Sequence, residues 1–300
     1  MSMQKRVLHF IKREKLWNAG KKVCVAVSGG VDSMVLMHVL HRTQRAHGGI
    51  LEVCTIDHRF RSESKEECAL VVQEAKRLGL LVYEVKLDIP KGGNLYERAR
   101  IERQKVLKNL ACDVIATGHH QADQAETLLY RLLRGSGLDG LSSMKPVQNG
   151  WCRPLLEESK EDILSFAQQE GIQWFDDPSN AHSIRGKLRS LLSDLDSIHG
   201  ASIPAIARTA SLLSEDATLL NEYTNTAWNR CHQGIGICAQ IWLQEPKGMQ
   251  LRLLKKLCLE RQVPIRAQVL QQFQRNPVRV QLPKGSWLLC EDGLIVIQRH

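Results

Sequence analysis

The sequence predicts an α/β fold, a doubly wound parallel sheet followed by a smaller, mainly helical C-terminal domain. Two observations lead to this prediction. From residue 23 onward, short apolar or β-branched runs alternate with longer helical patterns, an order that is typical of parallel strands joined by crossover helices. After residue 150 the helical patterns follow one another, separated by turn residues. We therefore expect two domains, over residues 1–200 and 201–300.

The predicted strands of the first domain are short runs rich in Val, Ile and Leu. Ligands of doubly wound sheets bind beyond the carboxyl ends of the strands, so the segments after residues 27, 56 and 117 are expected to surround one crevice. The strands are 23–27, 51–56, 80–86 and 113–117, and the helices are 32–43, 64–78, 94–110, 121–134, 158–169, 185–196 and 204–226, with a short β element near the C-terminus.

The charge balance is compatible with a polyanionic partner. The chain has 41 Lys and Arg against 32 Asp and Glu, a net charge of +9 with a pI of about 9.1. Residues 201–300 hold 12 basic and 7 acidic side chains, so the excess is concentrated toward the C-terminus. Charge alone supports nucleic-acid binding only weakly, because many basic proteins bind no nucleic acid.

The cysteines and the hydropathy pattern predict a soluble, cytoplasmic protein. The nine cysteines are odd in number, and most lie within apolar runs, which is typical of buried thiols in a reducing compartment. No C-x-x-C pair occurs, so the usual ligand pairs of zinc ribbons and iron–sulfur clusters are lacking. No apolar stretch approaches the length that spans a membrane.

A glycine-containing loop follows the first predicted strand and leads straight into a helix. Two successive glycines let backbone N–H groups turn toward an anion, and the helix N-terminus adds partial positive charge. A carboxylate beside phosphates needs a cation between them, so Asp32 is predicted to hold Mg²⁺, a role compatible with capping the helix. The loop consists of Ser28, Gly29, Gly30, Val31, Asp32 and Ser33.

This loop resembles the Ser-Gly-Gly-x-Asp-Ser loop of the PP-loop ATP pyrophosphatases, which have the adenine nucleotide alpha hydrolase-like fold. It is not a Walker A loop, because no G-x-x-x-x-G-K-[ST] occurs in the chain. Enzymes of that family release pyrophosphate from ATP and leave AMP on an oxygen of the substrate. The resemblance therefore implies that residues 28–33 bind ATP.

Two further segments follow predicted strands and contribute polar side chains to the same crevice. The first contains His58 and Arg61, and arginine can meet phosphates through its planar guanidinium; a solvated basic loop is the alternative. In the second, His119, Asp123 and Glu126 fall at i, i+4 and i+7, on one face of a helix that starts near residue 120. A histidine and two carboxylates can bind a metal such as zinc, transfer protons or hold an amine.

Several motifs together, in the same order along the chain, resemble those of the tRNA(Ile)-lysidine synthetases. The resemblance covers about residues 20–195, and His58 and Arg61 match a His-x-x-Arg of that family. The motifs are His119-His120-x-x-Asp123-Gln124-Ala125-Glu126-Thr127, Arg131-Leu132-Leu133-Arg134-Gly135-Ser136-Gly137, Arg153-Pro154-Leu155-Leu156 and Asp177-Pro178-Ser179-Asn180.

The resemblance implies an activity and its substrates. Such enzymes use ATP and free L-lysine to convert the anticodon cytidine of a tRNA(Ile) with a CAU anticodon into lysidine. The C2 oxygen of cytidine is first adenylated, and the ε-amine of lysine then displaces AMP. By the same resemblance, residues 1–200 form the catalytic domain and residues 201–300 bind tRNA.

The resemblance also assigns roles to individual residues. Asp123 and Glu126 are the candidates for orienting the lysine ammonium and accepting its proton, because an amine with a pKa of about 10.4 is mostly protonated at pH 7. His119 and Arg100 are assigned to the reacting phosphate or carbonyl, and Gly118 to the nucleotide site.

Two positions depart from the family pattern. Ala122 stands where the family usually has the first of two aspartates, and Gly186 stands where Arg-Asn-x-Ile-Arg typically has asparagine. The alternatives are a PP-loop enzyme that adenylates tRNA for another nucleophile, as in thiolation, a tRNA-binding homologue without turnover, and a metal-dependent hydrolase built on His119, Asp123 and Glu126. The sequence leaves the oligomeric state open, a homodimer included.

Overall fold

The structure is a computed structural model that describes residues 1–59, 63–87, 95–142, 144–176, 184–264 and 266–299. The chain forms two compact units, Met1–Ser214 and Glu215–His300, and the division between them falls within one helix, α9 (Ser202–Cys231). The boundary predicted at residue 200 instead marks the start of this helix, whose first turns belong to the first unit.

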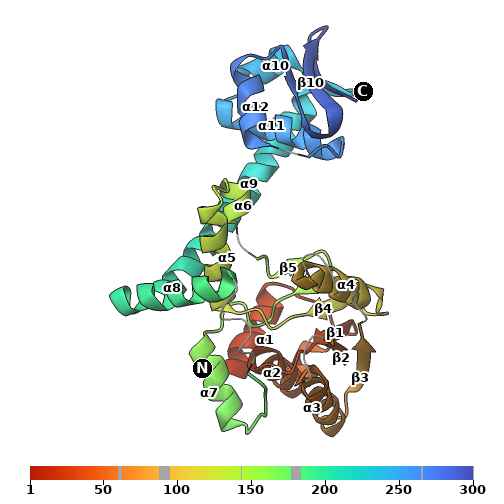
Figure 1. The fold of residues 1–300 in the computed structure, drawn as a ribbon, viewed down its shortest axis with the longest axis vertical. Coiled ribbons are helices and arrows are strands. Elements are labelled where there is room, and N and C mark those ends of the chain that lie inside the picture. The colour runs from red at the N-terminus through yellow and green to blue at the C-terminus, as the bar shows by residue number, and fades with distance from the viewer. Residues whose placement is uncertain (60–62, 88–94, 143, 177–183, 265, 300) are drawn as a thin grey trace. The chain divides into compact units, whose positions relative to one another are not determined.

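The first unit contains a six-stranded sheet in the order β3-β2-β1-β4-β6-β5 (Figure 1). All its strand pairs are parallel except β5 with β6, which is antiparallel and lies at the edge. The four predicted strands are confirmed, whereas β5 and β6 have two residues each and were not predicted from an apolar run. The strands are β1 (Lys22–Ala26), β2 (Ile50–Asp57), β3 (Leu81–Lys86), β4 (Val114–Ala116), β5 (Val147–Gln148) and β6 (Trp151–Cys152).

Both faces of this sheet are covered, as the doubly wound prediction requires. Val23 and Val25 of β1 belong to one buried cluster, and the alternate residues Cys24 and Ala26 belong to another that contains Leu107. This alternation follows from the two-residue repeat of a strand. The first cluster includes residues of α1 (Met3–Arg13), α2 (Val31–His47), α3 (Glu63–Arg77) and α7 (Lys160–Gln169), and the second those of α4 (Leu95–Asn109).

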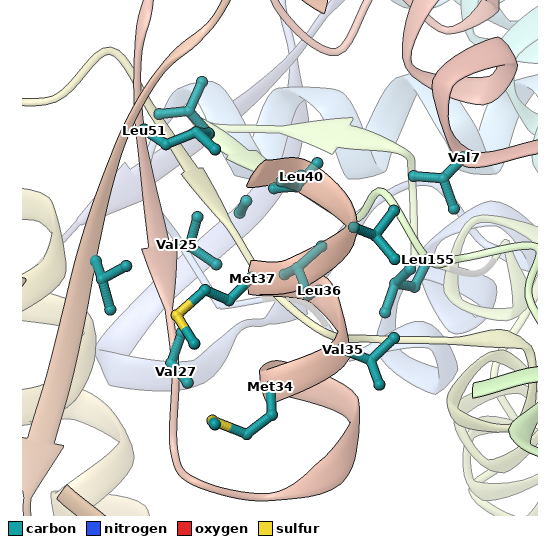
Figure 2. Close-up of a cluster of buried hydrophobic side chains, with 14 of the residues drawn as sticks. Val7, Val25, Val27, Met34, Val35, Leu36, Met37, Leu40, Leu51 and Leu155 are labelled. Carbon is teal, nitrogen blue, oxygen red and sulfur yellow. The ribbon is translucent and has the colours of Figure 1, made fainter. Parts of the chain in front are cut away.

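Helix α2 is apolar on nearly all sides because it is surrounded by protein. Figure 2 shows its side chains between the sheet, where Val25 and Leu51 lie, and the residues Val7 and Leu155 on the other side. Burial of each large apolar side chain contributes about 1.5–3 kcal/mol. The start of α2, which carries the phosphate loop, is therefore attached to the most deeply buried helix of the unit. Its fully buried residues include Met34, Val35, Leu36, Met37 and Leu40.

Three more helices complete the first unit before α9. Helix α5 (Gln121–Leu133) packs against α8 (Ile184–His199), and α6 (Leu138–Leu141) follows α5 after a short turn. The helices predicted at 121–134 and 185–196 are thus confirmed. Their contact matters for function because α5 carries two of the predicted site carboxylates.

The second unit combines helices with a five-stranded antiparallel sheet in the order β7-β8-β11-β10-β9. The β10–β11 hairpin is the short β element predicted near the C-terminus. Trp242 and Phe273 are buried in its core. The elements are β7 (His232–Gln233), β8 (Gly236–Cys238), α10 (Ala239–Gln244), α11 (Lys247–Glu260), α12 (Ala267–Arg275), β9 (Arg279–Gln281), β10 (Ser286–Glu291) and β11 (Leu294–Arg299). Among the described residues of either unit, no helix is long and apolar enough to cross a membrane.

Candidate functional site

The loop between β1 and α2 has the geometry of an anion cradle. Gly29 has a φ of +85°, which residues with a side chain rarely adopt, and Gly30 is the extended N-cap of α2. Ser33 stabilises the turn, because its Oγ accepts a hydrogen bond from the N–H of Ser28 at 3.1 Å and donates one to the carbonyl of Gly30 at 2.9 Å. The first turn of α2 therefore points its free N–H groups at the space beyond β1.

The segment after β4 passes directly against this first turn. A Cβ atom at Gly118 would lie 3.0 Å from the carbonyl carbon and oxygen of Asp32 and 3.1 Å from the backbone nitrogen of Ser33. Such distances are shorter than most Cβ contacts, so a side chain here would push the neighbouring backbone away, and glycine permits the close approach. This contact brings the start of α5 next to the phosphate loop.

His120 occupies the junction between the loop and α5. It is the N-cap of α5, where its backbone N–H donates to Oδ2 of Asp123 at 3.0 Å and its Nδ1 accepts from the N–H of Ala122 at 3.3 Å. Its Nε2 lies 3.7 Å from Oδ1 of Asp32 and 3.6 Å from Oδ2 of Asp123. His120 thus connects the two predicted acidic residues, although the sequence prediction had chosen its neighbour.

His119 lies one residue earlier, where it points toward a different partner. Its Nδ1 is 2.8 Å from Oγ1 of Thr117. Burial lowers the pKa of His119 to about 4, and Arg153 and Arg103 add to the effect, while Asp123 opposes it. The imidazole is therefore neutral at pH 7 and can serve as a hydrogen-bond partner rather than as a cation.

The two carboxylates of α5 have pKa values shifted in opposite directions. Burial disfavours ionisation of Asp123, but interactions with His120 and His119 outweigh it and hold its pKa below the usual range. Burial raises the pKa of Glu126, and the guanidinium of Arg189, whose Nε lies 2.5 Å from Oε1, limits the rise. Two carboxyl groups whose pKa values are shifted apart can take different roles in a reaction that transfers a proton.

Lys160 also reaches the phosphate loop, and no sequence signal had indicated it. It is the first residue of α7, and its Nζ lies 2.5 Å from Oδ1 of Asp32. The two residues are 128 positions apart in the chain. Asp32 thus faces two nitrogen-bearing side chains, Lys160 and His120.

The residues around Asp32 fit a divalent cation that arrives together with phosphate. Mg²⁺ is commonly held by one or two carboxylates and by oxygens of a bound phosphate, and Asp32 supplies such a carboxylate at the loop. In the described part of the chain, no group of three or more His, Cys, Asp or Glu side chains is arranged to hold a metal ion by itself. The hydrolase alternative therefore lacks the ligand cluster that it requires from His119, Asp123 and Glu126.

The segment after β2 begins with a tightly bonded turn. Oδ1 of Asp57 accepts hydrogen bonds from the N–H of Arg59 at 2.8 Å and from Oγ of Ser64 at 2.6 Å. His58 lies in this turn, and burial lowers its pKa, with Arg103 adding to the effect. Arg61, predicted with His58 to meet the nucleotide, lies outside the described residues.

Helix α4 carries two arginines that differ in exposure, the predicted Arg100 and Arg103. Arg100 is exposed on α4, whereas Arg103, one turn later, is half-buried and lowers the pKa of both His58 and His119. Burial also lowers the pKa of Arg103 itself. The charge of Arg103 therefore acts on both predicted histidines, His58 and His119.

Comparison with known proteins identifies the family of the chain. A family model described as a PP-loop domain matches residues 1–194. The tRNA(Ile)-lysidine synthase of Azoarcus sp. (strain BH72) is 33% identical over 296 residues, which cover 93% of this chain and 66% of that protein. The protein of the same name from Symbiobacterium thermophilum is 36% identical over 248 residues, which cover 77% of this chain and 52% of that protein.

A solved structure has a similar fold. The U34-tRNA thiolase NcsA from Methanococcus maripaludis, which holds a [4Fe-4S] cluster, superposes with a TM-score of 0.60 at 20% identity, over 71% of this chain and 78% of that one. At this identity the likeness concerns the fold alone. The chain matches between about half and two thirds of the length of the two bacterial relatives, 52% and 66%.

Proposed function

The chain belongs to the PP-loop domain family, and we propose that it uses ATP to ligate lysine to C2 of the anticodon cytidine of a tRNA(Ile) with a CAU anticodon. The observation that carries this proposal is the close approach of α5 to the phosphate loop, through Gly118 and His120. It brings carboxylates that can handle an amine beside the loop where ATP would be activated. The relatives named tRNA(Ile)-lysidine synthase support the choice of substrates.

The first step of the proposed reaction is adenylation of the cytidine. The C2 oxygen attacks the α-phosphorus of ATP, the bond from that phosphorus to the bridging oxygen breaks, and its electron pair leaves on pyrophosphate. The backbone N–H groups of the loop at Gly29 and Gly30, with the hydroxyls of Ser28 and Ser33, bind the departing phosphates. Mg²⁺, bound through Asp32, would neutralise charge on the phosphate oxygens.

The second step transfers lysine to the activated ring. The ε-amine attacks C2, the C2–O bond breaks, and AMP leaves with the electron pair. Lysine arrives protonated at neutral pH, so the ammonium must be oriented and then give up a proton. Asp123, whose pKa is held below the usual range by its neighbours, suits the first task, and Glu126, whose pKa is raised by burial, suits acceptance of the proton.

The remaining assignments follow from the same proposal. His119 is a neutral hydrogen-bond partner for the reacting groups, and Arg103 joins Arg100 as a candidate cation of α4. Residues 201–300 bind the tRNA, supported by their excess of 12 basic over 7 acidic side chains. All nine cysteines are free, which suits a cytoplasmic enzyme.

Thiolation is the second candidate, because the fold is shared with a tRNA thiolase. That relative holds an iron–sulfur cluster, whereas this sequence contains no C-x-x-C ligand pair. Cys24, Cys54 and Cys152 are instead buried within the strands of the sheet. The residues therefore favour an amine as the nucleophile.

One incubation separates the candidates. The protein is mixed with ATP, labelled lysine and a tRNA(Ile) transcript with a CAU anticodon, and pyrophosphate, AMP and label in the tRNA are measured. We expect all three in equal amounts. Pyrophosphate without incorporated label would contradict lysine as the nucleophile, and no pyrophosphate beside an active control synthase would favour a tRNA-binding homologue without turnover.

A further inference from the structure

The cation at the start of α7 is in an unusual position for a helix. Lys160 is the first residue of α7, where the helix end carries partial positive charge and acidic residues are favoured. Glu161 and Asp162, the next two residues, follow this preference. Lys160 does not, and its Nζ lies 2.5 Å from Oδ1 of Asp32. The Asp32 carboxylate opposite it offsets this unfavourable position.

The backbone at the start of α7 is firmly held. Arg6 of α1 donates to both carboxylate oxygens of Glu158, which is buried, and to Oδ2 of Asp162. The N–H of Gln121, the first residue of α5, donates to the carbonyl of Glu158 at 3.1 Å. These contacts tie the start of α7 to α1 and α5, so only the side chain of Lys160, 35% exposed, is free to change its partner.

The carboxylate that Lys160 contacts is also the one proposed to hold Mg²⁺. An ammonium and a divalent cation compete for Oδ1, because like charges a few ångströms apart repel each other. Arrival of ATP with its cation must therefore displace Lys160 from Asp32. The same event supplies phosphate oxygens as new acceptors, and the flexible stem of lysine suits such an exchange.

We propose that Lys160 is a phosphate-binding residue that serves as the counter-ion of Asp32 until the nucleotide arrives. With ATP bound, its ammonium turns to the β- and γ-phosphate oxygens, where it stabilises the negative charge that pyrophosphate gains as it leaves. Lys160 forms no covalent bond and loses no proton. The inference rests on the proposed use of ATP, but it requires neither tRNA nor lysine.

The first test measures competition for Asp32 in nucleotide-free protein. Asp32 alone is a weak ligand, so Mn²⁺ at high concentration serves as the probe, its binding is followed by electron paramagnetic resonance, and Asp32→Asn gives the background from other carboxylates. Lys160→Met is expected to bind Mn²⁺ about tenfold more tightly than wild type, because the competing ammonium is gone. Lys160→Arg keeps the cation and should stay within about twofold of wild type. Lys21→Met is the matched control, because Lys21 forms a similar pair with Asp113, at 2.9 Å, before the first residues of β1 and β4.

The second test measures nucleotide binding with α,β-methylene ATP at saturating Mn²⁺. Lys160→Met should bind it about tenfold more weakly, and Lys160→Arg within about threefold of wild type. Weaker nucleotide binding with unchanged Mn²⁺ affinity would overturn the exchange at Asp32. Tighter Mn²⁺ binding with unchanged nucleotide affinity would overturn the phosphate contact.

Two controls keep these results interpretable. Thermal unfolding verifies that each variant folds, and Lys160→Arg provides a folded variant that retains the charge. Neither titration measures turnover, so both remain decisive if the protein makes no lysidine. If both expected shifts occur in a protein that makes no lysidine, the proposed function is contradicted and the role of Lys160 is supported.

Discussion

Arg189 of α8 donates from Nε to Oε1 of Glu126 of α5 across 2.5 Å, and this bond joins the two helices at the candidate site. The carboxylate is 5% exposed, whereas the arginine is 49% exposed. Glu126 is thus a buried acid whose cationic partner, Arg189, is accessible to solvent. Arg189 ends the segment 185–189, in which Gly186 departs from the family pattern.

Replacing Arg189 should impair lysine transfer more than adenylation. In Arg189→Met, the pKa of Glu126 rises further, because the guanidinium that opposes the effect of burial is lost. A smaller fraction of Glu126 is then ionised at a given pH, so we expect slower incorporation of lysine, and the rising limb of its pH–rate profile should shift to higher pH. Pyrophosphate release should stay within about twofold of wild type. Equal losses in both assays, or no recovery in Arg189→Lys, would argue against this division of roles.

Asp32 should be required for pyrophosphate release and not for tRNA binding. Asp32→Asn keeps the size of the side chain but removes the charge that a Mg²⁺ ion needs. We expect pyrophosphate release to fall at least about a hundredfold, and the dissociation constant for tRNA, measured by filter binding, to change less than about twofold. Asp113→Asn, which affects the distant pair with Lys21, is the control. A large loss of tRNA affinity in Asp32→Asn would contradict the proposed role.

His119 should make the protein less stable as the pH falls. Its pKa of about 4 in the folded state is below that of an unfolded histidine, so the unfolded chain takes up the proton first, and stability is lost between about pH 7 and pH 4. At pH 5 the loss from this residue is about 2 kcal/mol relative to pH 7. The free energy of unfolding in urea, measured at pH 7 and pH 5 for wild type and His119→Gln, gives this loss. Parallel pH dependence in the two proteins would show that His119 does not contribute.

A side chain at Gly118 should disturb the phosphate loop. In Gly118→Ala the new Cβ would lie 3.0 Å from the backbone of Asp32, and relief of the clash must shift either the phosphate loop or the start of α5. Such overpacking costs about 1–3 kcal/mol, and we expect pyrophosphate release to fall about tenfold or more. Gly137→Ala is the control, because Gly137 has a φ of −74° and open space around it. Wild-type activity in Gly118→Ala would show that the contact does not constrain the loop.

The affinity for tRNA should depend steeply on salt. Each phosphate contact made by Lys or Arg releases counterions, so the logarithm of the binding constant falls linearly with the logarithm of the salt concentration. We expect a loss of about a hundredfold between 50 and 200 mM salt if residues 201–300 make several such contacts. Lys255→Ala with Lys256→Ala should reduce the slope. A flat salt dependence of the wild type would contradict a phosphate-binding surface in this region.

The sheet and the phosphate loop could be predicted because their signals are local. The apolar run at residues 23–27 indicates a strand by itself, and Gly29 with Gly30 indicates a turn before a helix. The two-residue strands β5 and β6 are too short to give such a pattern. β6 forms because the edge of β4 is open to it, and β5 pairs in turn with β6.

The site could be predicted only in part, because which side chains meet depends on contacts distant in sequence. His119 and His120 are adjacent, and only the exact start of α5 decides which one faces Asp32. Lys160 reaches Asp32 across 128 positions, and no spacing rule connects them. Arg103 resembles any other charged residue of α4 until the burial of its side chain is known.

Asp123 has one consequence for how this region can evolve. The same carboxylate that accepts the N–H of His120 at the first turn of α5 is the one proposed to receive the lysine ammonium. Selection on Asp123 therefore acts on the start of the helix and on lysine binding at the same time. Replacement of Asp123 by Asn or Ser would keep an acceptor for the N–H of His120 but would remove the charge proposed to bind the lysine ammonium. Variants of this kind should accumulate in lineages that have lost turnover, where the helix is still needed.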